Sequence, residues 1–417
     1  MKTNPSLLLA CVAAGLLVAC HPAAQKEAAA KPAYLSGAYA PTLPRQPSVA
    51  AMTAMGRAMF FEPSLSVSGK LSCASCHSPE HAYGPPNGLA VQLGGPQLQD
   101  AGTRAAPSLR YLQTAPAFTE HFHDDDGDDS VDAGPTGGRN WDGRAPSGHE
   151  QALAPLLSKR EMGNRDAAAV VARLRAGPLA GQFRRTYGAD IFEQPGQALR
   201  WALMSLEVFQ ESPSDFYPYT SKYDAFLRKQ VSLTPQEARG LALFNDAAKG
   251  NCASCHISRI APGGAFPQFT DYGLINIGVP RNGRLPANAD PSFFDLGLCG
   301  PDRTDLMQHK EYCGSFKTPS LRNVAVRKVF FHNGSFDSLE QVLRFYVQRD
   351  TAPQKWYPRD NSGKVRKYDD LPPGMAANVN VDAPFDRQPG QPPAMNEKEI
   401  ADVIVFLKTL TDGYQTP

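Results

Sequence analysis

The sequence predicts a mainly α-helical protein with long ordered loops, organised as two similar halves. The first observation is a repeat: residues 73–77, Cys-Ala-Ser-Cys-His, return unchanged at residues 252–256. The second is that a capped helical pattern precedes each copy. The third is a content of 37 Pro and 35 Gly among 417 residues, which is typical of long loops around short helices.

Both copies have the form C-x-x-C-H, the attachment sequence of c-type haem. The two thiols add to the haem vinyl groups, and the histidine becomes the proximal iron ligand. Half zinc sites or redox C-x-x-C pairs are the alternatives, but zinc needs a second pair of ligands nearby and a redox pair needs no histidine. We therefore predict two covalently bound haem c groups. Their residues are Cys73, Cys76 and His77 for one group and Cys252, Cys255 and His256 for the other.

The segment before each copy predicts a helix. Ser48 can cap the first helix, whose apolar residues recur at helical spacing. The second opens at residues 234–237, where Thr is the N-cap, Pro occupies the first turn and Glu stands at the third position. This duplication predicts two cytochrome c-type domains, at residues 46–225 and 226–417.

Other elements follow from capping residues and apolar stripes. Helices are expected over Asp166 to Ala176, around Leu199 to Phe209, over Leu339 to Gln348 and after Asn396. Ordered loops are expected at residues 263–301 and 351–395, and Ser212 to Tyr223 is expected to link the domains.

The N-terminus has the features of a targeting segment. Lys2 precedes an apolar run from Leu7 to Val18, which is too short to span a bilayer. The run ends Leu-Val-Ala-Cys at Cys20, like a bacterial lipobox, so residues 1–20 are predicted to be a signal peptide with Cys20 lipidated. An ordinary cleaved signal peptide is the alternative. Residues 21–45 then read as a flexible tether.

Composition limits the remaining possibilities. A net charge of +1 provides no basic field for nucleic acid. Cys299 and Cys313 belong to neither haem motif, and in an exported protein they are predicted to form a disulfide that staples a loop. Two free thiols are the alternative.

Peroxide chemistry at a haem needs an open iron site, a group that moves protons and a route for electrons. Trp141 is a candidate relay, and Glu161, held by Gln151, is a candidate acid–base group, with Pro155 in the same stretch. A core tryptophan and a solvated glutamate remain the ordinary alternatives for these residues.

Tyr346 lies on the apolar stripe of the helix expected at 339–348, so it should be buried and its hydroxyl needs a partner. Haem iron is one partner and a backbone carbonyl is the other. The acidic run at residues 121–129 suggests either a calcium site or a solvated loop, because it lacks the terminal Glu of an EF-hand. His81, His149 and His309 have no motif context.

Several motifs together resemble a known family. They are W-D-G-R at 141–144, E-Q-A-x-x-P at 150–155, E-M-G at 161–163, F-K-T-P-S-L-R-N-V at 316–324, F-H-N-G-S-F at 331–336 and T-L-T-D-G-Y at 409–414. With the two C-x-x-C-H motifs, they resemble the bacterial di-haem cytochrome c peroxidase and MauG superfamily over residues 50–413.

The resemblance implies roles for the residues of the first half. The haem on His77 would be the high-spin site where peroxide binds, and Trp141 matches the tryptophan between the haems. Gln151, Pro155 and Glu161 match the residues of the distal pocket over that haem.

For the second half, the resemblance implies a six-coordinate haem on His256. Peroxidases of the family place a methionine fourteen residues after the histidine of F-H-x-G, and MauG-like members place a tyrosine there. Tyr346 stands fourteen residues after His332, which favours the MauG-like side.

Two departures from the family pattern matter. No clear counterpart of the family's distal loop histidine stands between His77 and Ala106, although His81 is a candidate. The family's inter-haem calcium uses an asparagine shortly before Pro-Ser or Pro-Thr, and here the run at residues 104–108, Arg-Ala-Ala-Pro-Ser, has alanine instead.

The sequence therefore predicts a periplasmic, membrane-anchored lipoprotein of a Gram-negative bacterium that uses hydrogen peroxide. Its substrate would be a partner protein oxidised at a distance, as in MauG, or a small electron-donor protein, as in a cytochrome c peroxidase. The alternative is a non-catalytic electron-transfer cytochrome with two closed haems.

Overall fold

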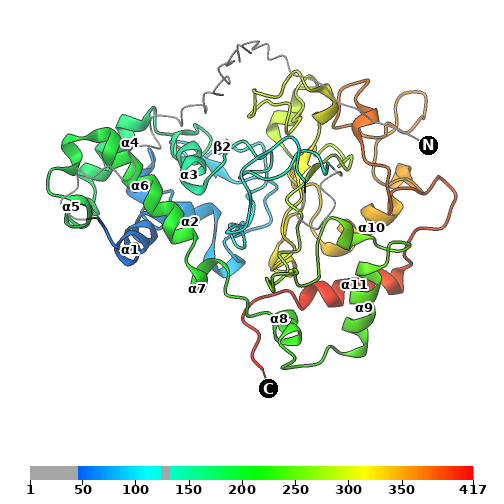
Figure 1. Cartoon of the computed structure of the whole chain (residues 1–417). Coiled ribbons are helices and arrows are strands. Elements are labelled where there is room, and N and C mark those ends of the chain that lie inside the picture. The colour runs from blue at the N-terminus through cyan, green and yellow to red at the C-terminus, as the bar shows by residue number, and fades with distance from the viewer. Residues whose placement is uncertain (1–45, 124–131, 417) are drawn as a thin grey trace, which may run out of the picture. The chain divides into compact units, whose positions relative to one another are not determined.

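The computed structural model describes residues 46–123 and 132–416, where helices prevail and strands are few and short (Figure 1). The longer α-helices are α1 (Val49–Phe60), α3 (Gly148–Leu157), α4 (Ala167–Ala176), α5 (Ala180–Tyr187), α6 (Pro195–Gln210), α9 (Pro235–Asn245), α10 (Leu339–Gln348) and α11 (Glu397–Lys408). The shorter ones are α2 (Cys73–Cys76), α7 (Pro213–Phe216) and α8 (Lys222–Leu227). The 3₁₀ turns are η1 (Pro63–Leu65), η2 (Pro79–His81), η3 (Ile191–Glu193), η4 (Cys252–Ser254), η5 (Pro286–Ala289), η6 (Lys310–Tyr312), η7 (Val324–Val326), η8 (Pro353–Lys355) and η9 (Ala376–Asn378).

The predicted signal peptide at 1–20 and tether at 21–45 lie outside the described residues. Among residues 46–123 and 132–416, no helix is both long enough and apolar enough to cross a membrane.

Two short antiparallel pairs make up the strands. β1 (Leu93–Gly94) pairs with β2 (Asp100–Ala101), and β3 (Leu274–Ile275) pairs with β4 (Phe316–Lys317). In the second pair Leu274 faces Lys317 across the ladder. This pairing fixes β4, which begins the F-K-T-P-S segment, next to the candidate site.

The predicted helices form where their capping residues stand. Ser48 accepts a hydrogen bond from the N–H of Ala51 at 3.2 Å. Thr234 and Glu237 form the expected capping box of α9, and Asp166, Ser338 and Asn396 cap α4, α10 and α11. The predicted linker from Ser212 to Tyr223 is more regular than expected. It contains α7 and the start of α8, because Ser221 and Asp224 form a further capping box.

The duplicated segments make equivalent helix contacts. A Cβ added to Gly56 of α1 would lie 1.8 Å from the Ser205 carbonyl oxygen of α6. A Cβ added to Gly240 of α9 would lie 2.1 Å from the Asp402 carbonyl oxygen of α11. Each glycine therefore allows two helix backbones to touch, and these two helix pairs are seen in Figure 1.

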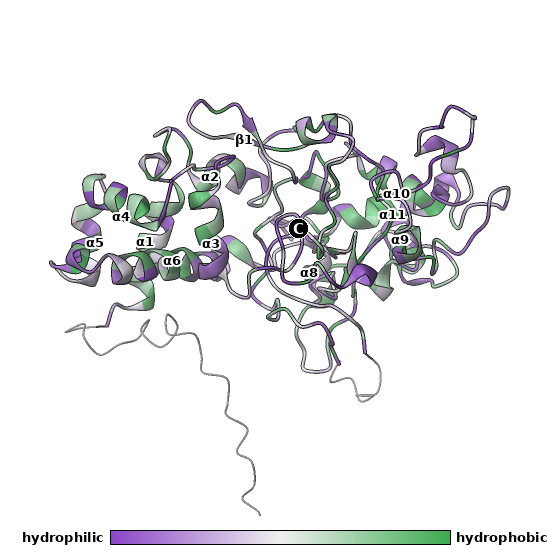
Figure 2. Ribbon diagram, turned by 90° about the horizontal axis from the view of Figure 1, so that it is seen from above, coloured by the Kyte–Doolittle hydropathy of each residue, from purple (hydrophilic) through white to green (hydrophobic). Residues whose placement is uncertain are grey.

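The apolar core consists of two main clusters. The first gathers buried side chains between Met52 and Phe216, and the second gathers those between Tyr223 and Leu410. Figure 2 shows apolar and polar residues alternating along the helices that supply them. All described residues nevertheless belong to one compact unit, so the division at residue 225 stays a prediction.

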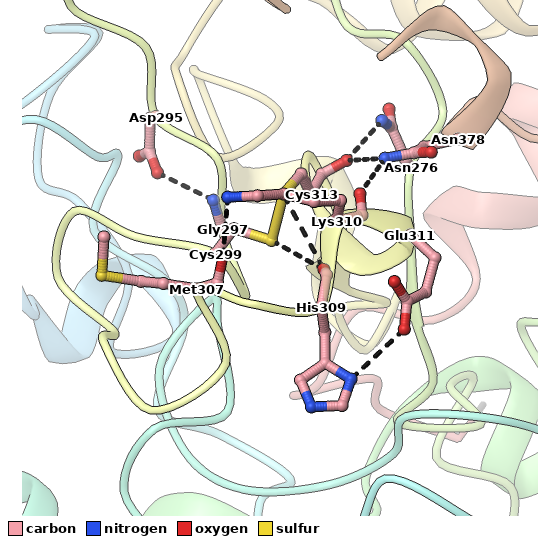
Figure 3. Close-up of a disulfide and its surroundings, with 10 residues drawn as sticks. All are labelled: Asn276, Asp295, Gly297, Cys299, Met307, His309, Lys310, Glu311, Cys313 and Asn378. Atoms are coloured by element: carbon pink, nitrogen blue, oxygen red, sulfur yellow. Dashed lines mark hydrogen bonds and ion pairs between the residues drawn. A yellow bond between two sulfur atoms is a disulfide. The ribbon is translucent and has the colours of Figure 1, made fainter.

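The predicted disulfide is present between Cys299 and Cys313 (Figure 3). The carbonyl of Cys313 accepts hydrogen bonds from the side-chain amides of Asn276 and Asn378. The disulfide thus holds a loop against segments that are distant in the sequence.

Candidate functional site

One cavity of about 800 Å³ is lined by both C-x-x-C-H motifs. It is predominantly apolar, and residues from helices α3 and α10, strand β4 and the loops around them complete its wall. A cavity of this size is typical of a site for a cofactor or a large ligand. The two motifs therefore belong to one connected site although they lie far apart in the sequence.

The first motif occupies the short helix α2. Neither Cys73 nor Cys76 is in a disulfide, and burial raises the pKa of each thiol to about 12. The Nδ1 of His77 lies 3.1 Å from the carbonyl oxygen of Tyr83. Burial lowers the pKa of His77 to about 4, so the ring is neutral and Nδ1 is the nitrogen that donates. The lone pair of Nε2 is then free to bind a metal.

The second motif repeats this arrangement at η4. Cys252 and Cys255 are also free, and burial raises their pKa values to about 12 and about 11. The Nδ1 of His256 donates to the carbonyl oxygen of Phe269 at 2.8 Å, and burial lowers the pKa of this ring to about 4. Each half of the chain thus presents two thiols outside any disulfide and one neutral histidine held by a backbone carbonyl.

Two cations of the cavity wall, the buried Lys317 and the part-buried Arg327, suit a haem. Lys317 is 8 % exposed and its ammonium donates to the carbonyl of Gly138, while Arg327 donates to the carbonyls of Val329 and Ala106. Neither forms an ion pair with an acidic side chain among the described residues. Buried charges are normally paired, so these two cations fit the propionate groups that a haem brings. The residues present therefore fit two haem groups.

The predicted distal residues of the first half lie on α3 and the turn after it. Gln151, Pro155 and Glu161 all line the cavity. Pro155 lies inside α3, where its missing N–H leaves the carbonyl of Gln151 without its helical partner. Gln151 itself donates to the side chain of Asn140 at 3.2 Å. The expectation that Gln151 holds Glu161 is therefore wrong.

Glu161 is held instead by the turn that follows α3. Its N–H donates to the carbonyl of Ser158, and the Ser158 hydroxyl contacts its carboxylate. Burial raises the pKa of Glu161, and Ser158 and Arg144 oppose that rise. The carboxylate lies near the Cys76 thiol, whose pKa it raises further after burial. Glu161 is thus an accessible acid on the cavity wall beside the first motif.

Trp141 is 9 % exposed and lines the same cavity. Its indole N–H donates to the carbonyl of Ala105 at 2.8 Å, and its own carbonyl accepts from the backbone N–H of Lys317. The next residue, Asp142, is fully buried and pairs with Arg104 at 2.6 Å and Arg144 at 2.7 Å. The tryptophan is therefore held by both its ring and its backbone.

Tyr346 comes from α10 and lines the cavity. It is part-buried rather than buried, since the cavity is open beside it. Its ring stacks on Phe385 at 5.4 Å. Burial raises the pKa of Tyr346, and the thiols of Cys255 and Cys252 raise it further, which places the phenol near the second motif. Its hydroxyl has no hydrogen bond to any described residue.

Two groups at this site were missed in the sequence. Arg104 bridges Asp142 and Asp295, with a bond of 2.7 Å to the latter, and it lines the cavity. His332 was used only as a reference point for Tyr346. It is buried, its ring stacks on Phe316 at 3.5 Å, and its Nε2 has no partner. Arg104 has no spacing signal that sequence reasoning could use, whereas His332 stands in the F-H-N-G-S-F motif, which could have indicated a role for it.

The predicted calcium site in the acidic run at residues 121–129 remains untested. Residues 124–131 of the acidic run lie outside the described ranges. Among the residues that are described, no three His, Cys, Asp or Glu side chains group as metal ligands. The loop histidine candidate, His81, lines the cavity and its Nδ1 lies 3.2 Å from the Ser78 hydroxyl.

Comparisons with known proteins agree with this site. The model of the family described as di-haem cytochrome c peroxidase matches residues 50–232. Methylamine utilization protein MauG of Paracoccus denitrificans is 33% identical over 383 residues, which cover 89% of this chain and 91% of that protein. Cytochrome c peroxidase Ccp of Escherichia coli is 25% identical over 72% of this chain and 54% of that protein.

A solved structure is similar over nearly the same length. The di-haem peroxidase BthA of Burkholderia thailandensis is 38% identical, with a TM-score of 0.77, over 88% of this chain and 87% of that chain. The relationship to MauG covers almost the whole chain, and the superfamily predicted from the motifs is confirmed. The chain belongs to the di-haem cytochrome c peroxidase and MauG superfamily and is a peroxidase-like oxidoreductase with two haem groups.

Proposed function

We propose that this protein uses hydrogen peroxide at the haem of its first half to oxidise a partner protein, in the manner of MauG. The observation that carries the proposal is the asymmetry of the cavity. An accessible acid on the cavity wall, Glu161, lies beside the first motif, whereas Tyr346, whose hydroxyl bonds to no described residue, lies near the second. The two halves have the same C-x-x-C-H motif, but a different side chain lies near each motif: Glu161 in the first half and Tyr346 in the second.

The haem groups would be attached covalently through the thiols, with His77 and His256 as the proximal ligands. When bound, a haem supplies an iron that binds peroxide and stores oxidising equivalents. Both histidines donate Nδ1–H to a backbone carbonyl, which fixes the ring orientation and leaves Nε2 for the metal. We assign the first site as open, because the acid beside it is suited to proton transfer.

Glu161 carries the proton chemistry in this proposal. Desolvation within the cavity raises its pKa, so it holds a proton closer to neutral pH than a fully solvated glutamate and can both give and take one. Ser158 orients the carboxylate, and Arg144 limits the rise in pKa. Gln151 and Pro155 form the wall of α3 next to it, and they exclude water and limit what can approach the first motif.

Tyr346 would be the second axial ligand of the haem on His256. Without a metal its pKa is raised, but a bound cation reverses that tendency and stabilises the phenolate. A phenolate is a hard anionic ligand and favours oxidised iron over reduced iron. Trp141, fixed between Ala105 and Lys317 on the wall of the shared cavity, would couple the two centres.

The oxidised substrate would be a protein outside the cell membrane. The lipobox sequence ending at Cys20 supports export and a lipid anchor in a Gram-negative periplasm. The disulfide between Cys299 and Cys313 supports an oxidising compartment. A small electron-donor protein is the second candidate substrate, since similar proteins include cytochrome c peroxidases.

The ferric absorption and EPR spectra, before and after one equivalent of peroxide, test this proposal. We expect one high-spin and one low-spin ferric centre, and peroxide should change both. Two low-spin centres that do not respond to peroxide would identify an electron-transfer cytochrome instead.

A further inference from the structure

A fully buried tyrosine lies beside the cavity with its hydroxyl on a carboxylate. Tyr111 has no exposed area, and its hydroxyl donates to Asp412 Oδ1 at 2.7 Å. The guanidinium of Arg322, which lines the cavity, lies 4.5 Å from the centre of the Tyr111 ring. A single side chain therefore separates this phenol from the cavity.

The surroundings of Tyr111 determine how it can be oxidised. Arg322 faces the ring as a cation, with its charge paired to Asp224 at 2.9 Å, so a positive charge left on the ring would be unfavourable. Electron loss must therefore be accompanied by proton loss. Asp412 Oδ1 is placed to accept that proton directly through a charge-assisted hydrogen bond.

The phenol does not lose its proton on its own. Burial raises the pKa of Tyr111, and the neighbouring Asp412 raises it further, so the hydroxyl is protonated at any working pH. Arg110 and Asn323 bind Asp412 Oδ2 at 2.9 and 2.7 Å, which leaves Oδ1 to Tyr111 and two weaker contacts from Thr220. The proton moves only when the electron leaves.

Further aromatic rings connect Tyr111 with the surface. The ring of Tyr219 lies 5.2 Å from that of Tyr111, and the N–H of Tyr219 donates to the Tyr111 hydroxyl at 3.0 Å. The ring of Tyr217 follows at 6.5 Å, and its hydroxyl donates to the carbonyl of Glu211 at the solvent-exposed edge. Arg322 on the cavity wall and the three tyrosines thus form a series of contacts that ends at the hydrogen bond of Tyr217 to the exposed Glu211.

We propose that Tyr111 is a redox-active relay residue that gives one electron to the peroxide-derived oxidant in the cavity and its hydroxyl proton to Asp412. The inference rests on the proposed function, because hydrogen peroxide is the oxidant. The O–H bond of Tyr111 breaks, the proton binds the carboxylate, and a neutral phenoxyl radical remains. One oxidising equivalent derived from peroxide is consumed. An electron from a donor docked near Tyr217 restores the phenol, and Asp412 returns the proton.

The experiment treats the di-haem protein with one equivalent of peroxide in the absence of a donor and records EPR spectra of rapidly frozen samples. The wild type should give an organic radical signal that narrows when the protein is made with ring-deuterated tyrosine. Tyr111→Phe, which keeps the ring and its contact with Arg322, should lose this signal and prolong the oxidised haem spectrum. In D₂O the decay of that spectrum should slow in the wild type but not in Tyr111→Phe.

Tyr187→Phe is the matched control, because Tyr187 is equally buried but its hydroxyl bonds with Ser205 rather than a carboxylate. It should retain the radical. An undiminished signal in Tyr111→Phe overturns the inference, as does a wild-type signal that ring deuteration leaves unchanged. A haem spectrum that peroxide leaves unchanged contradicts the proposed function as well as the inference. A haem spectrum that peroxide changes, without a radical signal that depends on Tyr111, contradicts the inference alone.

Discussion

The indole N–H of Trp141 donates to the carbonyl of Ala105, and the N–H of Ala105 donates in turn to the carbonyl of His332 at 2.7 Å. The backbone of one residue thus connects the cavity tryptophan with the F-H-N-G segment. Ala105 lies in the run where the family has a calcium-binding asparagine. Its neighbour Arg104 already places a fixed positive charge there, between Asp142 and Asp295.

Replacing Tyr346 tests the ligand of the second haem. In Tyr346→Phe both haems should stay bound, because Cys252, Cys255 and His256 are unchanged, but the low-spin signature of the second centre should be altered. The EPR spectrum of the ferric protein measures this. Tyr357→Phe is the control, since Tyr357 is buried, donates to the Gly278 carbonyl and does not line the cavity. A wild-type spectrum in Tyr346→Phe would make Tyr346 a core residue.

Removing the proton-transferring group should slow the reaction with peroxide. Glu161→Gln keeps the shape of the side chain, and we expect the rate to fall by about 10²–10⁴-fold. The wild-type rate should change with pH through the raised pKa of Glu161, and the variant should lose that inflection. Stopped-flow absorption at several pH values measures both effects. Glu193→Gln, at an exposed position in η3, should behave as wild type.

The close contact of α9 with α11 predicts the effect of a single methyl group. Gly240→Ala should lower the free energy of unfolding by about 1–3 kcal/mol, because the added Cβ would lie 2.1 Å from the Asp402 carbonyl oxygen. Gly196→Ala in α6 is the control, since nothing lies within 4 Å of its added Cβ. Urea unfolding followed by circular dichroism compares them. Equal midpoints for the two variants would contradict the contact.

The pair His149 and Glu207 should make stability depend on pH. Their side chains approach to 2.6 Å, and Glu207 also accepts from the N–H of Gly148 at the start of α3. The Glu207 hydrogen bond raises the pKa of His149 against the effect of burial. Burial alone would raise the pKa of Glu207, but bonds from His149 and Gly148 leave it lowered.

Each partner of this pair limits stability at one end of the pH range. The His149 contribution is complete below its unfolded pKa of about 6.5 and is lost as pH rises through its raised folded pKa. The Glu207 contribution is present above about pH 4.3 and is lost as pH falls through its lowered folded pKa. In His149→Gln the alkaline part of this dependence should disappear from unfolding midpoints measured between pH 5 and about 8. His309→Gln, at an exposed site, should leave the wild-type curve unchanged.

The lipid anchor can be tested apart from the folded structure. Cys20→Ser should release the protein from the membrane fraction, because a serine cannot carry the thioether-linked lipid. Immunoblots of fractionated cells measure the distribution. Cys11→Ser, within the predicted signal peptide, should not change it. Unchanged membrane attachment in Cys20→Ser would remove the lipobox interpretation.

Sequence reasoning succeeded where the signal is local. The caps at Ser48, Thr234 and Asn396 and the disulfide between Cys299 and Cys313 follow from residue types at short spacing, and the structure confirms them. It failed for side-chain contacts that no pattern marks, even between residues eleven positions apart. Nothing near Gln151 indicates that its amide bonds with Asn140.

The missed polar groups share the same cause. Arg104 and Asp295 are far apart in the chain, and only the fold places them 2.7 Å apart. Lys317 stands in the F-K-T-P-S-L-R-N-V motif, but nothing in the motif indicates that burial in the cavity wall lowers its pKa to about 7. The chemistry of these side chains depends on their burial. No helical or strand periodicity in the sequence around them predicts that burial.

The paired glycines of the two halves have a consequence for how such chains diverge. Because Gly56 and Gly240 each sit where another backbone passes, neither position can accept a side chain unless both helices separate. The rest of each helix pair is free to exchange one apolar residue for another of similar volume. Over evolutionary time the sequences of the two halves can therefore diverge almost completely. Gly56, Gly240 and the two C-x-x-C-H motifs would then be the positions at which an internal duplication can still be recognised.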